Sequence, residues 1–237
     1  MRQCFRLDRL PGLVYLALSA AACTPAPPVL VPPTAGPVTS EQVKTWVEST
    51  APTEGVLHRF KWLFRDENSS AGGRGSLRIA VPDSLRFDVA GPLGTGRAAA
   101  VVVGDSALWV SSEKSIVDLV PVYELLWAMV GIARGPREGA DLKGLEEGKR
   151  IAWQYAVGTD TVSYLLTRES EAKLLAEVRR AGKVLGRTET VLGPDGQPLK
   201  AKLLVPTVPA KLDITYYASV PTPAFPPEIW LPSQPKP

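Results

Sequence analysis

The sequence has few of the residues that build metal and thiol sites. Its 237 residues include one histidine, His58, and two cysteines, Cys4 and Cys23. Zinc fingers, histidine-rich metal sites and disulfide frameworks need more of these ligands than the chain contains. We therefore expect no metal site and no cofactor.

The sequence also has little excess charge. Lysine and arginine number 27, aspartate and glutamate number 24, and the formal net charge is +3 at pH 7. Residues 1–22 hold three arginines and one aspartate, a net +2, which leaves +1 for the rest of the chain. A body so close to neutral has little field to attract phosphate backbones, so we exclude nucleic acid as a partner.

The N-terminal residues have the pattern of an export signal. Arginines lie within residues 1–9, a mainly apolar stretch of 13 residues follows at Leu10–Ala22, and three alanines precede Cys23. Thirteen residues are too few for a helix to cross about 30 Å of hydrocarbon. The sequence therefore predicts a signal peptide over residues 1–22.

Leu16–Cys23 resembles a bacterial lipobox, in which a cysteine carrying diacylglycerol becomes the mature N-terminus. The resemblance departs from the usual pattern at Ala20, where a leucine is typical. Ordinary cleavage after an Ala-x-Ala site is the alternative. Residues 23–39 are interpreted as the lipidated Cys23 and a proline-rich tether, since prolines stiffen a chain at about 3.1 Å per residue. By the same analogy, Thr24 rather than aspartate favours the outer membrane.

Between this tether and the tail lies a body, residues 40–220, that alternates between apolar and polar side chains with the period of β-strands. Ser40 is the expected N-cap of a short helix over Glu41–Ser49. Residues 173–180 also suit a helix but are assigned to a strand. Short turns between so many strands predict an antiparallel sheet that curls or closes. The predicted strands are 56–65, 76–81, 85–90, 98–103, 107–110, 150–157, 161–167, 173–180, 184–192, 199–205 and 211–218.

One segment, Ser115–Arg134, is almost continuously apolar. Pro121 suits the first turn of a helix that runs to about Gly131. A membrane span would need about 18 consecutive apolar residues, whereas Asp118 and Glu124 interrupt this segment. A helix that is apolar on most sides must be buried or must cover something apolar. We therefore expect a lid over one apolar face of the sheet.

The sequence contains segments that resemble catalytic motifs, but each lacks a residue that the chemistry would need or has a simpler structural explanation. Gly104–Ser106 resembles the nucleophile block of a serine esterase family, but the only histidine, His58, precedes it, and Gly-Asp-Ser also suits a hairpin turn. His58 is expected to be a packing residue. Gly91–Gly96 lacks the ending of a phosphate loop. Asp66–Glu67 and Glu146–Glu147 are expected to be solvated acids on loops. We expect no enzyme.

Three segments, Phe60–Arg65, Gly73–Ile79 and Ser84–Gly94, resemble the early strands of LolB-type outer-membrane lipoprotein receptors and their relatives, including the periplasmic carrier LolA. The pattern extends over residues 40–218. The resemblance implies a mainly β (α+β) fold, in which a strongly curved antiparallel sheet forms an incomplete barrel with a helical lid. It also implies a cavity that holds the acyl chains of lipoproteins.

The resemblance assigns roles to particular residues. The cavity would be lined by apolar residues of three strands: Phe60, Trp62, Phe64, Leu77, Ile79, Leu85, Phe87 and Val89. The lid would be formed by Leu125, Leu126, Met129 and Val130. Pro92 and Leu93 would form an exposed transfer loop, unless Leu93 folds back onto the core. A packed core without ligand volume would give the same alternation.

These patterns together predict a non-enzymatic lipoprotein, anchored at the periplasmic face of a bacterial outer membrane. It would bind the acyl chains of lipids or lipoproteins during lipoprotein localisation, and a periplasmic LolA-like carrier would be a partner. The alternative is a structural envelope lipoprotein that docks proteins. In that case the proline-rich tail, residues 221–237, would serve as an extended ligand or strap.

Overall fold

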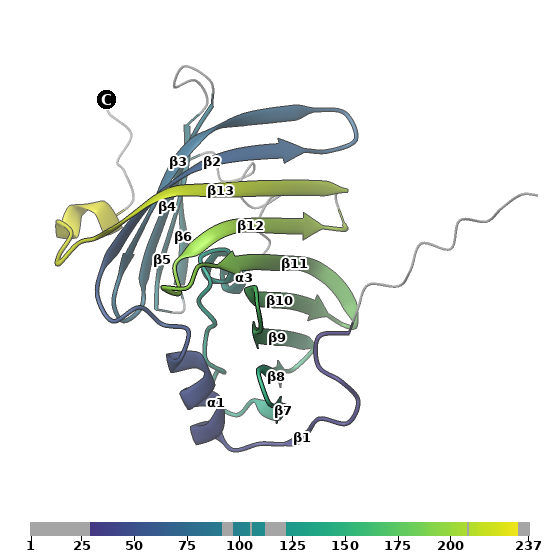
Figure 1. The fold of residues 1–237 in the computed structure, drawn as a ribbon. Helices are drawn as coiled ribbons and strands as arrows, with labels where there is room; N and C mark the ends of the chain where they lie inside the picture. The colour runs from purple at the N-terminus through teal and green to yellow at the C-terminus, as the bar shows by residue number, and fades with distance from the viewer. Residues whose placement is uncertain (1–28, 92–96, 105, 112–121, 208, 232–237) are drawn as a thin grey trace, which may run out of the picture.

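The computed structural model describes residues 29–91, 97–104, 106–111, 122–207 and 209–231. In these residues one antiparallel sheet of 13 strands has the order β1-β7-β8-β9-β10-β11-β12-β13-β2-β3-β4-β5-β6. The sheet is open and curves around helix α3 (Figure 1). We call the face toward α3 the inner face and the opposite face the outer face. The predicted curved, incompletely closed antiparallel sheet is confirmed.

Successive antiparallel neighbours connect β2 through β6 and β7 through β13, while β13 pairs with β2 and β1 pairs with β7. The bounds of the elements are β1 Gly36–Pro37, α1 Ser40–Glu48, β2 Val56–Arg65, β3 Ser70–Ala80, β4 Ser84–Ala90, β5 Arg97–Val103, β6 Ser106–Ser111, α3 Tyr123–Ala128, β7 Asp141–Glu147, β8 Arg150–Val157, β9 Asp160–Arg168, β10 Ala172–Arg180, β11 Lys183–Leu192, β12 Pro198–Val205, β13 Ala210–Pro221 and the 3-10 helix η2 Pro227–Trp230.

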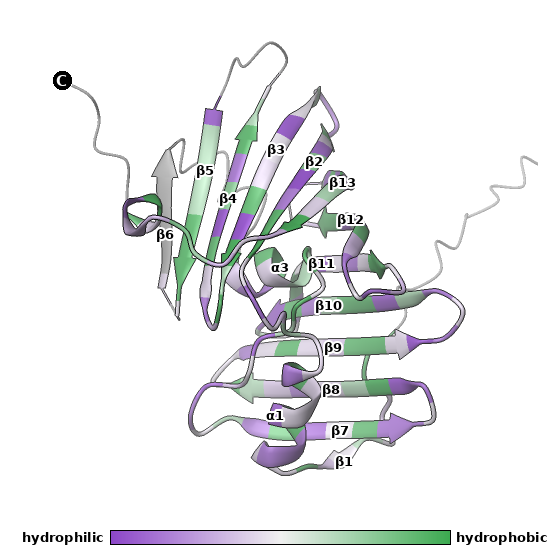
Figure 2. Ribbon diagram, turned by 60° about the vertical axis from the view of Figure 1, so that its left-hand side comes forward, coloured by the Kyte–Doolittle hydropathy of each residue, from purple (hydrophilic) through white to green (hydrophobic). Residues whose placement is uncertain are grey.

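Most predicted strands are confirmed to within a few residues, including the uncertain segment 173–180, which is β10. Strand β7 was missed because Asp141–Glu147 has only two large apolar residues and a central glycine. The expectation that Glu146–Glu147 lie on a loop is therefore wrong. Strand β3 also begins earlier than expected, at Ser70 instead of residue 76. Figure 2 shows hydrophobic and hydrophilic positions in bands along the strands.

Helix α1 begins one residue earlier than predicted. The N-cap is Thr39 rather than Ser40, because Gln42 stands three residues after Thr39 and completes a capping box with it. The hydroxyl of Thr39 accepts from the Gln42 amide at 3.2 Å, and the Gln42 side chain accepts from the Thr39 amide at 2.9 Å. Trp46 on the buried side of α1 donates its indole N–H to Glu146 at 3.1 Å, which holds the helix against β7.

Helix α3 is the core of the predicted lid, and Pro121 lies outside the described residues. Its C-terminal turn ends in a Schellman motif: the Ile132 amide donates to the Trp127 carbonyl and the Gly131 amide to the Ala128 carbonyl. Gly131 has φ 79°, and a Cβ there would lie 2.5 Å from Leu192. Glycine thus ends the lid at the predicted position. Among the described residues, no helix is long and apolar enough to cross a membrane.

Two glycines in β3 let the aromatic side chains of β2 lie flat across the inner face. A Cβ at Gly75 would clash with the Phe60 ring, and a Cβ at Gly73 would clash with the Ala90 carbonyl and approach the Trp62 indole. These two residues flank Arg74 in the Gly-Arg-Gly segment that carried part of the family resemblance. The motif therefore has a packing role.

The segment interpreted as a tether is partly folded onto the body. Leu30 and Val31 are buried and pack against Ala152, Leu165 and Leu175 on the outer face. A little further on, β1 pairs with β7. The expectation of a free spacer through residue 39 is therefore corrected: only residues before Leu30 remain as a candidate spacer. Apolar side chains among the prolines explain the difference, because they gain free energy by burial.

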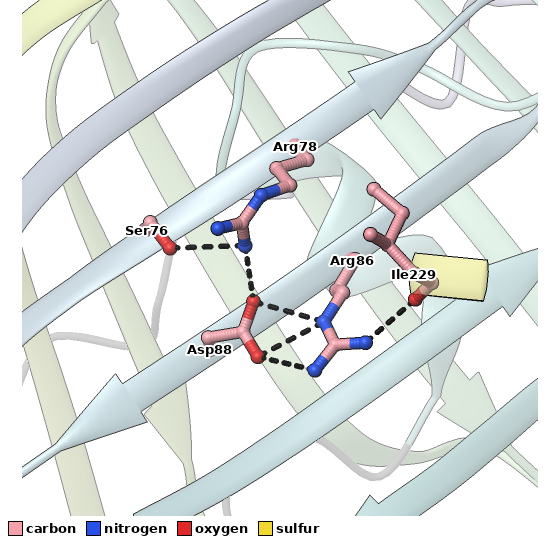
Figure 3. A network of polar contacts seen from close by, with 5 residues as sticks. All are labelled: Ser76, Arg78, Arg86, Asp88 and Ile229. Atoms are coloured by element: carbon pink, nitrogen blue, oxygen red, sulfur yellow. Dashed lines mark hydrogen bonds and ion pairs between the residues drawn. The ribbon is translucent and has the colours of Figure 1, made fainter. Parts of the chain in front are cut away.

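The C-terminal tail returns to the outer face of the sheet. Arg86 of β4 donates to the Ile229 carbonyl of η2 at 2.6 Å (Figure 3). The same arginine also contacts Asp88, whose second partner is Arg78 at 2.6 Å. Under the tail, the outward-facing Val101 of β5 is fully buried. The tail residues up to Trp230 therefore belong to the folded body.

Candidate functional site

The inner face divides into a closed part and a half-open part. Five of the predicted cavity residues are almost fully buried in the main core: Phe60, Leu77, Ile79, Leu85 and Phe87. The other three, Trp62, Phe64 and Val89, are only partly buried and pack against that core. The structure therefore brings all eight onto one face, with solvent access confined to the last three.

The closed part is a tightly stacked aromatic cluster. Phe60 stacks on Phe87 with ring centroids 5.2 Å apart and meets Tyr216 edge-on at 5.8 Å. His58 lies 5.7 Å from Tyr216, and its Nδ1 is 2.8 Å from Ser219 Oγ. Burial lowers the pKa of His58 to about 4, so the ring is neutral at pH 7. His58 is the packing residue that the sequence predicted.

The half-open part, formed by Trp62, Phe64 and Val89, is continuous with this cluster but remains accessible to solvent. Trp62 lies across β3, where its indole N–H donates to the Ala90 carbonyl at 3.2 Å and to the Arg74 carbonyl at 3.3 Å. Phe64 lies two residues further along β2. Its partner on β3 is Ala71, which is exposed to solvent. An apolar ligand could extend the core here without displacing a buried side chain.

The predicted lid residues are all buried. Leu125, Leu126 and Met129 have no exposed surface, and Val130 is 3% exposed. Two buried hydroxyls on the inner face hold the C-terminal end of the lid: Thr190 donates to the Ala128 carbonyl and Tyr216 to the Met129 carbonyl, each at 2.7 Å. Sequence reasoning missed these hydroxyls. Their only signal is that they occupy inner-face positions of β11 and β13.

Removing one of these hydroxyls should weaken the attachment of the lid. We expect Tyr216→Phe to lower the free energy of unfolding by about 1–3 kcal/mol, because the buried Met129 carbonyl loses its donor while the ring packing is kept. Urea unfolding and amide hydrogen exchange in α3 measure the effect. Tyr217→Phe is the matched control, since Tyr217 is 53% exposed. Equal stability of the two variants would contradict a holding role for the hydroxyl.

Near the N-terminal end of α3 the structure has a pocket of about 260 Å³, lined by valines and by charged residues. The Glu124 side chain is only 8% exposed and lies 3.9 Å from Arg137. Tyr155 forms part of the wall, and burial raises its pKa well above the usual value. Across the pocket, Arg180 makes a two-point contact with Asp160 at 2.9 Å. Charges thus surround this end of the lid.

At the other end of the lid lies a larger pocket of about 430 Å³. Its walls come from the α1–β2 connection, the Val130–Ile132 turn and the β11–β12 turn, and they combine apolar with polar groups. Its lining includes the apolar Leu166 and Leu192 and the charged Glu54, Arg168 and Asp195. Sequence reasoning did not find this pocket, because segments far apart in the chain form it.

Some predicted site residues lie outside the described residues. These are the lipidation candidate Cys23 and the transfer-loop residues Pro92 and Leu93. Their assignments stay predictions.

The fold has counterparts among solved structures. A LolA superfamily protein from Nitrosomonas europaea matches with a TM-score of 0.54 and 12% identity, covering 82% of this chain and 98% of that chain. A domain named for outer membrane lipoprotein sorting, from Vibrio parahaemolyticus, matches with a TM-score of 0.54 and 10% identity, covering 81% and 97%. Searches of protein-family models and of curated proteins gave no match. The chain therefore shares the open, curved sheet of these two solved structures.

Proposed function

We propose that this protein is a non-enzymatic lipoprotein of the bacterial envelope that binds acyl chains on the inner face of its sheet. Lipidated Cys23 would anchor it to the outer membrane, on the periplasmic side. The acyl chains would belong to lipids or to lipoproteins in transit, and a LolA-like carrier would be the partner that delivers them. The names of the two structural counterparts support the assignment to lipoprotein sorting.

One observation carries the proposal: the apolar inner face continues without a polar break from the closed core to the half-buried Trp62, Phe64 and Val89. This partly open apolar row, with the rings of Trp62 and Phe64, offers a surface on which a ligand could complete the core. An acyl chain laid along this row would gain about 0.8 kcal/mol per buried CH₂. Transfer then needs only a second site of higher affinity and no catalytic group.

Photocrosslinking in living cells tests the proposal. The photoreactive p-benzoylphenylalanine replaces Phe64, which is half-buried and similar in shape, and adducts are identified by mass spectrometry. We expect adducts with lipid acyl chains or with the acylated N-termini of other lipoproteins. The control position is Lys143, which is exposed on β7.

The outcomes separate the two functions that the sequence left open. Acyl adducts from position 64 and not from position 143 support acyl binding. Adducts from position 64 that are only intramolecular would mean that the half-open row is a filled core. That result would reject acyl binding and favour a scaffold that docks other envelope proteins.

A further inference from the structure

The outer face of β12, β13, β2 and β3 is strongly cationic, although the chain as a whole is close to neutral. Among the outward-facing residues toward the Arg65 end of these strands, Asp213 is the one acid. The cations form what we call the outer cationic patch: Arg59, Lys61, Arg65, Arg74, Lys200, Lys202 and Lys211. All are exposed except Lys211, which is partly exposed.

Strand register places these cations side by side. Lys61 is the partner of Arg74 on β3 and of Thr215 on β13, and Thr215 is in turn the partner of Lys200 on β12. One row therefore crosses four strands with three cations and no acid. In the next rows, Asp213 contacts Arg65 at 3.5 Å and Lys211 at 3.1 Å. Within these four strands a single carboxylate faces seven cations, and the acids at the border of the patch are Glu189, the β11 partner of Lys202, and Asp66 and Glu67 in the β2–β3 turn.

The neighbouring outer surface of β10 and β11 is closer to balance, because Lys173 lies within ion-pair distance of both Glu171 and Glu189. On β10 and β11, Glu177 is paired with both Arg179 and Arg187. On the other side, the single acid Asp88 is paired with both Arg78 and Arg86, so a smaller excess of one cation continues onto β3 and β4 (Figure 3). A cluster of exposed cations on this part of the outer face indicates an interaction surface for an anionic partner.

Two further features favour a membrane over an acidic protein. Leu204 and Tyr217 are 40% and 53% exposed on β12 and β13, so apolar and aromatic groups stand among the cations, as they do in interfacial membrane-binding surfaces. In addition, Leu30, seven residues after the predicted anchor Cys23, packs on the outer face of β8 to β10 in the same sheet. We propose that the outer cationic patch rests on an anionic phospholipid surface.

Binding to a phospholipid surface can be measured on a protein that lacks the acyl anchor, and the measurement does not depend on acyl binding at the inner face. The mature chain with Cys23→Ala is mixed with vesicles of phosphatidylglycerol and phosphatidylethanolamine, and binding is measured by flotation. Vesicles of phosphatidylcholine and phosphatidylethanolamine carry no net charge and serve as the lipid control. We expect binding to the anionic vesicles only, and a steep loss of binding as the salt concentration rises.

Charge reversal within the patch identifies the surface. Lys61→Glu with Arg74→Glu should lower the partition coefficient on the anionic vesicles on the order of 25-fold or more, since each cation near such a surface contributes about fivefold. The matched control is Lys143→Glu with Lys149→Glu, which makes the same charge change at exposed residues of β7 and its turn. This control should bind nearly as well as the parent.

Two results would overturn the proposal. One is a protein that does not bind anionic vesicles at low salt but does bind polyglutamate, an acidic polypeptide. That result would indicate an acidic protein partner instead. The other is equal loss of vesicle binding in the patch variant and the β7 variant, which would indicate attraction through net charge alone. Acyl adducts from position 64 do not bear on either result, so this inference and the proposed function can fail separately.

Discussion

Phe87→Glu is expected to unfold the protein rather than to block a ligand site. Phe87 is 4% exposed, stacks on Phe60, and lies between Leu77 and Ala100 on the adjacent strands. A carboxylate at this position would be buried among apolar groups with no partner, which costs several kcal/mol of a total stability of about 5–15 kcal/mol. Circular dichroism and urea unfolding measure the loss.

Val220→Glu provides the control for this substitution. Val220 lies on β13 and is 48% exposed, so the same new charge should change the free energy of unfolding by no more than about 0.5 kcal/mol. A stably folded Phe87→Glu protein would show that water or ligand volume reaches this residue. In that case the closed part of the inner face would have to be reassigned as an open cavity.

The second large effect is expected at the proposed anchor. Wild-type protein should stay in the membrane pellet at 1 M salt and leave it only with detergent, because acyl chains are held by the hydrophobic effect. Cys23→Ala should be released from the membrane at that salt concentration, since only the outer cationic patch would then hold it and salt screens that attraction. Fractionation of cell envelopes with immunodetection measures the distribution.

Cys4→Ala is the matched control for the anchor, because Cys4 lies in the predicted signal peptide and is removed with it. This variant should fractionate like the wild type. Retention of Cys23→Ala in the pellet at 1 M salt would reject lipidation of Cys23 as the means of attachment. The folded body and its inner face would be unaffected by that result.

The sequence alone determined most of the strands and which of their residues share a face. Side chains alternate across a strand, so the positions of Phe60, Phe87 and Leu77 on one apolar face followed from period-two spacing. The same local rules predicted His58 as a packing residue and Gly131 as the end of the lid. Local spacing could not reveal β7, because Asp141–Glu147 carries too few apolar residues for alternation to be visible.

The tertiary structure decided how the faces are used. Whether an apolar row is closed, as at Phe87, or half-open, as at Phe64, depends on what packs against it from elsewhere in the chain. The outer cationic patch arises because β13, the last strand, pairs with β2, near the start of the chain. Charges remote in sequence become neighbours only through that pairing, so a nearly neutral composition conceals a strongly charged surface.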